Sequence, residues 1–260
     1  MPALAAGAGS GPESGVAGGE YVRYGILGDI HSNLAALDAV VERLAQAGAE
    51  RYLCVGDIVG YGADAEACVA RVRELDPLVV GGNHDWAVAG RLSLDFFNAP
   101  ARAAILWTRK ALSRADTAWL GSLELSCVLD GITLVHSTVH DPAVFDYLQT
   151  PYDAYLSFRA LTTPIAFVGH SHIPITFFDG PTITYSIDSR IETANERTIS
   201  NVGSVGQPRD EDPRASCGVL DTAAGVLEVL RVPYDVEATA ARIRQAGLPP
   251  LLAERLRLGR

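Results

Sequence analysis

Residues 24–33 have the sequence YGILGDIHSN, which predicts a short buried strand that runs into a polar loop. Apolar residues then recur at helical spacing over 34–44, before Gly48 ends the pattern. The alternation continues with a strand over 52–55, a helix over 63–75 and a strand over 78–80. This β-α-β-α-β order predicts parallel strands joined by right-handed crossovers, the arrangement of an α/β fold.

The rest of the chain adds helices first and strands later. Residues 86–123 are expected to form a mostly helical insertion, and Asp130-Gly131 predicts the tight turn of a hairpin over 125–135. The expected elements after the hairpin are a helix over 152–161, strands over 165–168, 176–178, 182–186, 216–220 and 226–232, and helices over 236–246 and 251–258. Residues 21–260 are therefore expected to form a single domain.

Composition excludes several classes of protein. The chain has 260 residues, of which 48% are hydrophobic and 20% charged, so it can bury a full core and is not expected to be disordered. It contains no apolar run of 18 residues, so we expect no membrane-spanning helix. A formal net charge of −10 repels polyanions, which argues against a stable nucleic-acid complex. It does not argue against a local cationic site built from bound metal.

The cysteines and the first residues bear on location. Cys54, Cys68, Cys127 and Cys217 are widely spaced and form no C-x-x-C pair, which favours free thiols in a reducing cytoplasm. Residues 1–20 are rich in Gly, Ala and Ser, and they lack the basic start and continuous apolar core of a signal peptide. We expect them to form a flexible tail outside the domain.

Five predicted strands run directly into polar blocks rich in Gly, Asp and His. The blocks are Gly28-Asp29-Ile30-His31, Gly56-Asp57, Gly82-Asn83-His84-Asp85, His136-Ser137 and Gly169-His170-Ser171-His172. In an open α/β sheet, ligands bind beside the carboxyl ends of the strands. Blocks that meet there would bring together two carboxylates, one amide and four imidazoles, with His84 left over.

This donor set predicts a site for more than one metal ion. Alternate residues of an extended segment point the same way, so Asp29 and His31 are expected to grip one ion together, as are His170 and His172 with their neighbours. Seven donors are too many for one tetrahedral zinc, and mixed N and O ligands suit Mn, Fe, Zn or Co. Two ions that share a bridging carboxylate fit better. A single Gly-Asp pair or histidine is weak evidence, so the prediction depends on the ordered set.

The ordered blocks resemble those of the calcineurin-like metallophosphoesterase superfamily, whose pattern is D-x-H, G-D, G-N-H-(D/E), H and G-H-x-H. The match runs from Tyr24 to His172 with every block present. The resemblance implies a four-layer αββα sandwich of two mixed β-sheets flanked by helices, with a dinuclear site at one edge. It implies one metal held by Asp29, His31, Asp57 and His172, and a second held by Asp57, Asn83, His136 and His170, with Asp57 bridging.

The resemblance also implies hydrolysis of phosphate esters with two divalent ions (Mn, Fe, Zn, Co or Ni, with Mn expected for activity). Two ions about 3.5–4 Å apart can hold a shared hydroxide and clamp phosphoryl oxygens. His84 is expected to face the substrate as an electrostatic stabiliser or general acid, and the alternative is that it only orients Asn83. Asp85 is a candidate for the catalytic machinery as the partner that orients His84, although a solvent-facing or structural position is an equal alternative.

The second block departs from the pattern of the superfamily's serine/threonine protein phosphatases. Those enzymes carry G-D-x-V-D-R-G, and this chain has Gly60 and Tyr61 in place of that Asp and Arg. In the family the Asp orients the catalytic histidine and the Arg holds a phosphate monoester. The pattern instead resembles the compact bacterial, phosphodiesterase-like branch, and a diester carries less charge and needs fewer arginines. Phosphoproteins and dinucleoside polyphosphates are the alternative substrates, and a non-catalytic scaffold is disfavoured because all seven ligands and His84 are present.

Two further groups of residues are candidates for substrate contact. Residues 201–210, NVGSVGQPRD, are expected to form a tight loop near the metal edge, with Arg209 reaching a substrate phosphate. The alternative is an ion pair of Arg209 with Asp210 or Asp212. Four aromatic residues are candidates for a wall that contacts a nucleobase, although we favour a place for them in the helical core: Trp86, Phe96, Phe97 and Trp107. His140 is expected at the surface. The expected partner is a small phosphate ester or nucleotide-like substrate, with no membrane contact, and the oligomeric state is left open.

Overall fold

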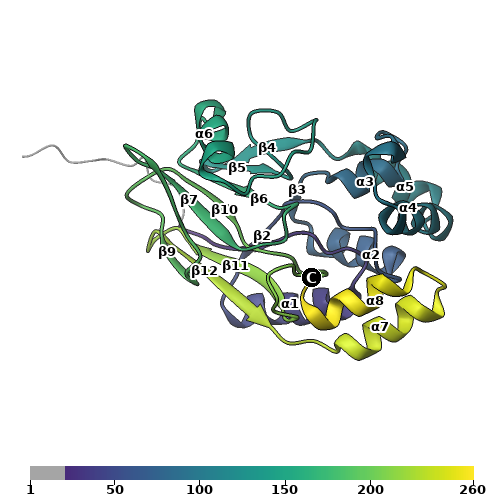
Figure 1. Cartoon of the computed structure of the whole chain (residues 1–260). Helices are drawn as coiled ribbons and strands as arrows, with labels where there is room; N and C mark the ends of the chain where they lie inside the picture. The colour runs from purple at the N-terminus through teal and green to yellow at the C-terminus, as the bar shows by residue number, and fades with distance from the viewer. Residues whose placement is uncertain (1–20) are drawn as a thin grey trace, which may run out of the picture.

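The structure is a computed structural model that describes residues 21–260, so the predicted tail at 1–20 lies outside the described residues. Two six-stranded sheets face each other, with helices outside them (Figure 1). The first sheet has the order β3 (Leu78–Val79), β2 (Arg51–Cys54), β1 (Arg23–Leu27), β11 (Ala215–Asp221), β12 (Val226–Val232) and β9 (Arg190–Glu192). The second has the order β4 (Ser126–Leu129), β5 (Ile132–Val135), β6 (Ile165–Val168), β10 (Thr198–Asn201), β7 (Ile175–Asp179) and β8 (Ile183–Ser186). The predicted αββα sandwich is confirmed.

The helices fall into groups around these sheets. Their bounds are α1 (Leu34–Gln46), α2 (Ala65–Leu75), α3 (Asn83–Val88), the 3-10 turn η1 (Leu94–Phe96), α4 (Ala99–Ala111), α5 (Arg114–Ser122), α6 (Pro151–Ala160), α7 (Val236–Gln245) and α8 (Pro250–Leu258). Helices α3, α4 and α5 pack together at one end of the molecule (Figure 1). Within 21–260, no helix is long and apolar enough to cross a membrane.

The local sequence signals produced the elements that they predicted. Strands β1, β2 and β3 pair in parallel, as the β-α-β-α-β order requires, whereas β11 pairs with β1 antiparallel and makes the sheet mixed. In the hairpin of β4 and β5, Asp130 has φ of 50° and Gly131 has φ of 79°. Two positive φ angles are what a type I′ turn demands, and Asp-Gly meets that demand at low cost.

The prediction missed strands β9 and β10, although β10 lies in the middle of the second sheet. Its sequence, Thr-Ile-Ser-Asn, lacks the apolar alternation of a strand, yet all four residues are buried. Hydrogen bonds offset the burial of its polar groups: Thr176 donates to Ser200 over 3.0 Å, and Asn201 Nδ2 donates to the carbonyl of Gly169 over 2.7 Å. A strand stabilised by such long-range bonds carries no local apolar signal.

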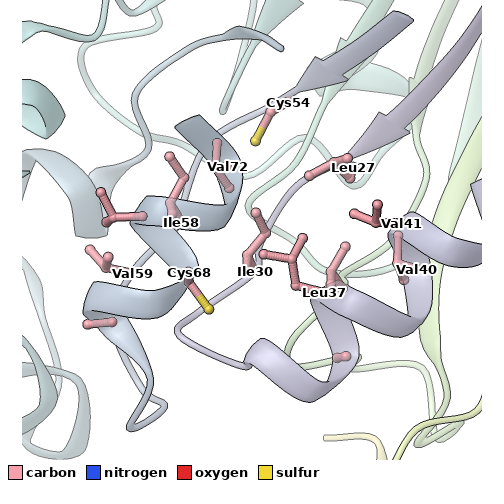
Figure 2. Close-up of a cluster of buried hydrophobic side chains, with 14 of the residues drawn as sticks. Leu27, Ile30, Leu37, Val40, Val41, Cys54, Ile58, Val59, Cys68 and Val72 are labelled. Carbon is pink, nitrogen blue, oxygen red and sulfur yellow. The ribbon is translucent and has the colours of Figure 1, made fainter. Parts of the chain in front are cut away.

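Alternating strand side chains build two cores that fix the strand ends. Ile26 and Leu53 pack between the sheets with Phe167 of the second sheet. The next residues, Leu27 and Cys54, point to the opposite face, where they pack against α1 and α2 (Figure 2). Strands buried on both faces are held rigidly, so the loops that leave them start from fixed positions.

Candidate metal centre

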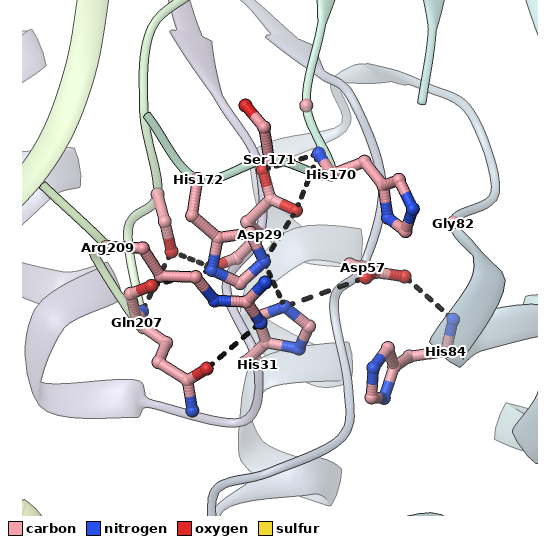
Figure 3. Close-up of polar contacts among 12 residues, drawn as sticks. Asp29, His31, Asp57, Gly82, His84, His170, Ser171, His172, Gln207 and Arg209 are labelled. Atoms are coloured by element: carbon pink, nitrogen blue, oxygen red, sulfur yellow. Dashed lines mark hydrogen bonds and ion pairs between the residues drawn. The ribbon is translucent and has the colours of Figure 1, made fainter. Parts of the chain in front are cut away.

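The seven predicted ligands meet at one edge of the sandwich. They leave β1, β2, β3, β5 and β6, and each is at most 9% exposed: Asp29, His31, Asp57, Asn83, His136, His170 and His172. Their ligand atoms fall into groups within 4.8 Å of one another, namely Asp29, His31 and His172; His31, Asp57 and His84; and Asp57, His136 and His170. Asn83 joins through its Oδ1, 3.1 Å from His136 Nε2. Figure 3 shows five of these side chains close together: Asp29, His31, Asp57, His170 and His172.

Backbone carbonyls orient three of the imidazoles. The Nδ1 atoms of His31, His136 and His172 lie 3.1, 2.8 and 2.6 Å from the carbonyl oxygens of Val59, Val55 and Gln207. A carbonyl can only accept, so each Nδ1 carries the proton and donates it. In the neutral ring, Nε2 is then a bare lone pair that points into the centre, as in a histidine that binds metal.

These lone pairs face other acceptors. His31 Nε2 is 3.1 Å from His172 Nε2, which is itself 3.3 Å from Asp29 Oδ1. The Nε2 of His136 differs, because it lies 3.3 Å from Asp57 Oδ2 in an ion pair when the ring is protonated. Acceptors held this close in a buried site repel one another unless a cation lies among them. The donor set of carboxylate, amide and imidazole therefore fits divalent metal ions.

Protonation in the metal-free protein supports this conclusion. Burial lowers the pKa of His31 and His172 well below its usual value and that of His170 to about 3, so these rings stay neutral. Burial also disfavours charge on His136, but Asp57 outweighs it and raises the pKa of His136 to about 9. The protonated imidazole of His136 therefore places beside Asp57 a positive charge that a bound metal ion would otherwise provide.

The two carboxylates of the centre differ. Burial raises the pKa of Asp29 to about 7. Burial opposes ionisation of Asp57 too, but the imidazoles of His136 and His84 hold its pKa well below the usual range. The backbone N–H of His84, at the start of α3, also donates to Asp57 Oδ1 over 2.8 Å. Asp57 is therefore the carboxylate that the surroundings keep charged.

The backbone at the ligands is left-handed, not extended as we expected from the residue spacing. Asp29 and His31 have φ of 49° and 48°, and His170 and His172 have φ of 67° and 62°. Left-handed φ is costly for residues with a side chain, and such strain concentrates at functional sites. The expectation that His170 and His172 point the same way is wrong, because His170 approaches Asp57 whereas His172 approaches Asp29.

Asp85 does not orient His84. Its Oδ1 accepts from the backbone N–H groups of Ile58 and Val59 over 2.9 and 3.2 Å, and its Oδ2 accepts from Gly82 over 3.1 Å. Burial raises its pKa to about 7. Asp85 instead fastens the loop after β2 to the first turn of α3, which carries Asn83 and His84.

A cavity of about 440 Å³ opens beside the ligands, and Arg209 lies in its wall. The two carboxylates that were the alternative partners of Arg209 pair with other arginines: Asp210 pairs with Arg231, and Asp212 pairs with Arg214. Arg209 Nη2 instead lies 3.3 Å from Tyr61 Oη. It also lies 3.2 Å from Gln207 Oε1 (Figure 3). The loop over 201–210 does reach the metal edge, where Gly206 N–H donates to the carbonyl of Asp29 over 2.9 Å.

The four aromatic candidates divide between wall and core. Phe96 and Phe97 line the cavity, whereas Trp107 packs in the helical core and Trp86 Nε1 donates to the carbonyl of Leu123 over 3.1 Å. His140 is exposed, as expected.

Sequence reasoning missed three other aromatic residues in the wall. Tyr61 follows the second block by a few residues, which was the one available signal. Phe145 and Tyr147 come from the loop between β5 and α6, which carries no recognisable motif. Tyr147 stacks on His170, with ring centroids 4.2 Å apart and planes 12° apart.

Comparison with known proteins agrees with this geometry. The model of the calcineurin-like phosphoesterase superfamily domain matches residues 22–225. An uncharacterised protein of Methanocaldococcus jannaschii is 38% identical over 240 residues, which cover 90% of this chain and 97% of that protein. The crystal structure of a metallophosphoesterase from Sphaerobacter thermophilus is 38% identical, with a TM-score of 0.83, and the match covers 93% of this chain and all of that one. A hypothetical protein of Pyrococcus horikoshii OT3 shares the fold at 19% identity and a TM-score of 0.76, over 92% of this chain and 98% of its own.

Proposed function

The chain belongs to the calcineurin-like phosphoesterase superfamily and is a metal-dependent phosphoesterase, and we propose that it hydrolyses small phosphodiesters with two divalent ions. One observation carries the metal requirement. His31 and His172 turn unprotonated Nε2 atoms toward each other at 3.1 Å while carbonyls hold their other nitrogens. Such a contact in a buried site favours a cation. We also propose a cytoplasmic location for the protein, because its four cysteines are free thiols, as is usual in a reducing compartment.

The proposed ligands form two sets, one at each end of the cluster, that share Asp57. Asp29, His31, Asp57 and His172 would hold one ion, and Asp57, Asn83, His136 and His170 would hold the other, with Asp57 shared. When bound, two such ions supply a hydroxide nucleophile at neutral pH and neutralise charge on the phosphoryl oxygens. Mn²⁺ is the proposed ion for activity, since mixed nitrogen and oxygen ligands suit it.

The chain's own residues bind and orient the ester. Arg209 would hold a phosphoryl oxygen, because its guanidinium lies in the cavity wall without a carboxylate partner among the described residues. His84 lies in the same wall and would assist departure of the leaving group. The carbonyls of Val55, Val59 and Gln207 keep three imidazoles turned toward the centre.

The cavity favours a diester over a monoester. Among its described lining residues, Arg209 is the one arginine or lysine, and Asp146 adds a negative charge. One cation beside an acidic residue leaves the second charge of a dianionic monoester without a partner, whereas a singly charged diester needs a single cation. Phe96, Phe97 and Tyr147 offer apolar faces to an organic group, which suits an aryl or nucleoside ester.

A substrate panel tests the proposal. With Mn²⁺, we expect kcat/KM for bis-p-nitrophenyl phosphate to exceed that for p-nitrophenyl phosphate by roughly tenfold or more, which is about 1.4 kcal/mol of discrimination. A phosphopeptide, diadenosine tetraphosphate and cyclic nucleotides complete the panel. Chelation should abolish the activity and Mn²⁺ should restore it. Fastest turnover of the phosphopeptide or the tetraphosphate would replace the diester by that substrate, and no metal-dependent turnover at all would favour a scaffold.

Substitution of Arg209 tests how the substrate is held. Arg209→Ala should lower kcat/KM for the diester by roughly 10–100-fold, mainly through KM, because a hydrogen bond to a charged group contributes about 1.5–3 kcal/mol. Arg214→Ala is the matched control, since Arg214 pairs with Asp212 on the exposed part of the same segment. Equal kinetics of the two variants would remove Arg209 from the substrate site.

A further inference from the structure

The imidazole of His84 has no polar partner that could hold it in place. The side chain is 3% exposed, and its Nδ1 is buried without a hydrogen-bond partner among the described residues. Both oxygens of the neighbouring Asp85 are taken by backbone N–H groups. Gly60 leaves no room for another partner, because a Cβ at that position would lie 2.3 Å from His84 Nδ1.

Aromatic rings surround His84 instead. The ring centroid of Tyr61 lies 4.4 Å from that of His84, at an interplanar angle of 55°. Phe97 and His31 lie 5.1 and 4.9 Å away and present edges to faces at 80° and 79°. Ring pairs at these distances and angles attract one another and resist rotation, because the positive edge of one ring faces the negative face of the other.

Each of these rings is itself held by other parts of the fold. Tyr61 packs against Leu252 and Ile243 of the α7–α8 hairpin, and its hydroxyl contacts Arg209. Phe97 follows η1 and is half-buried against the core of α4. His31 is fixed by the carbonyl of Val59. The helices around the site thus set the position of His84 through these rings.

We propose that Tyr61 and Phe97 are positioning residues that, with His31, form an aromatic cage around His84, and that the caged imidazole offers its Nε2–H to the leaving-group oxygen. The inference rests on the proposed phosphodiester hydrolysis. A buried N–H without an acceptor is disfavoured more strongly than a buried lone pair, so the proton belongs on Nε2, toward the cavity. A water-derived oxygen forms a new bond to phosphorus while the P–O bond to the leaving group breaks, and the electron pair of the broken bond moves to the leaving oxygen. The Nε2–H bond stabilises that charge without transferring the proton.

A leaving-group series tests the cage. Methyl aryl phosphates carry the same charge but differ in the pKa of the released phenol. In His84→Ala, kcat should fall by about 10²–10³-fold for the phenyl ester, as when one preorganised donor is removed, and much less for the p-nitrophenyl ester. Phe97→Leu should also lower kcat more for the phenyl ester than for the p-nitrophenyl ester, but by a smaller factor than His84→Ala does. The amount of bound metal should not change. Phe178→Leu is the matched control: Phe178, on β7, is also partly buried in a hydrophobic core but belongs neither to the cavity wall nor to the cage, so the ratio of the two esters should stay as in the wild type.

A double-mutant cycle and a spectroscopic measurement complete the test. In the His84→Ala background, Phe97→Leu should have no further effect on the ratio of the two esters, because it acts through His84. Nitrogen-15 NMR of the metal-free protein should show Nδ1 of His84 as the unprotonated nitrogen, and this signal should become averaged in Phe97→Leu.

The outcomes separate the cage from the proposed function. If Phe97→Leu keeps the wild-type ratio while His84→Ala does not, His84 acts without the cage and the inference is wrong. If His84→Ala itself keeps that ratio, or if His84 carries its proton on Nδ1, the donor role of His84 is wrong, although metal-dependent diester hydrolysis would stand. If the wild-type enzyme hydrolyses none of the esters, the proposed function fails.

Discussion

Single residues in this centre act through the backbone that surrounds them. The sequence indicated the proposed metal ligands because each follows a strand in a short polar block. It could not predict that carbonyls of Val55, Val59 and Gln207 would fix the proton of three imidazoles, since backbone groups leave no mark in a sequence. The left-handed φ of Asp29 and His31 was equally invisible, because neither residue type favours it strongly enough to signal it.

Gly60 offers a test at this scale. Gly60 and Gly90 have φ of 95° and 80°, so an alanine at either position should cost about 1 kcal/mol through backbone strain. Only at Gly60 would the new Cβ meet His84, 2.3 Å from Nδ1, whereas at Gly90 nothing lies within 4 Å. We expect kcat to fall more than tenfold in Gly60→Ala and to stay unchanged in Gly90→Ala, a loss of about 1.4 kcal/mol in transition-state stabilisation. Wild-type kcat in Gly60→Ala, with the expected loss of stability measured by urea unfolding, would contradict the placement of His84.

At the scale of elements, helix α3 positions the residues of the third block. It begins at Asn83, three residues before the helical region that the sequence predicted, so a ligand and His84 form its first turn. The earlier start follows from Asp85 in the first turn, whose carboxylate accepts the backbone N–H of the N-cap residue Gly82. The parallel strands were predictable from local apolar runs. Strand β10 was not, because its buried polar side chains are stabilised by hydrogen bonds to residues far along the chain.

Asp85→Asn tests how α3 supports the metal site. The amide would turn an N–H₂ group toward a backbone N–H, so the free energy of unfolding should fall by about 1–3 kcal/mol and metal affinity should weaken. Asp153→Asn is the matched control, because the carboxylate of Asp153 likewise accepts the backbone N–H of the N-cap residue, Thr150, at the start of α6, away from the site. Its cost should be about 0.3–1 kcal/mol with unchanged metal affinity. Calorimetric Mn²⁺ titration that finds equal affinity in both variants would show that α3 does not depend on Asp85.

For the whole molecule, the site lowers the stability of the fold mainly because it gathers ionisable groups in a buried place. An acidic chain of net charge −10 gathers two carboxylates and five buried imidazoles at one edge. The polar blocks after the predicted strands indicated the proposed ligands but not the cavity wall. Phe145 and Tyr147 reach the wall only because the loop between β5 and α6 folds over the site, which no local pattern indicates.

The stability of the metal-free protein should therefore depend on pH in a defined direction. Burial lowers the pKa of His31 and His172 well below the usual value, that of His84 to about 4 and that of His170 to about 3. These rings bind protons in the unfolded chain below about pH 6.5 but not in the folded one, so stability is lost as pH falls from about 6.5 toward 4.

Three groups oppose this trend in the same window. The raised pKa of about 7 at Asp29 and Asp85, and of about 9 at His136, favours the folded state at lower pH, but the four imidazoles with a lowered pKa outnumber them. Urea unfolding in chelator should show a lower free energy of unfolding at pH 5 than at pH 6.5. His170→Gln should reduce the difference, whereas His140→Gln, at an exposed histidine outside the site, should not. A free energy that rises on acidification would contradict the buried neutral imidazoles.

The most direct measurement is the anomalous scattering of a crystal of the Mn²⁺-loaded protein. Two peaks should flank the carboxylate of Asp57, one near Asp29, His31 and His172 and the other near Asn83, His136 and His170. Asp57→Asn should lose at least one of them, whereas Asp38→Asn, at an exposed carboxylate that pairs with Arg71 on the surface, should keep both. Absence of any peak beside Asp57 in fully loaded crystals, or a metal bound only elsewhere on the molecule, would contradict the account.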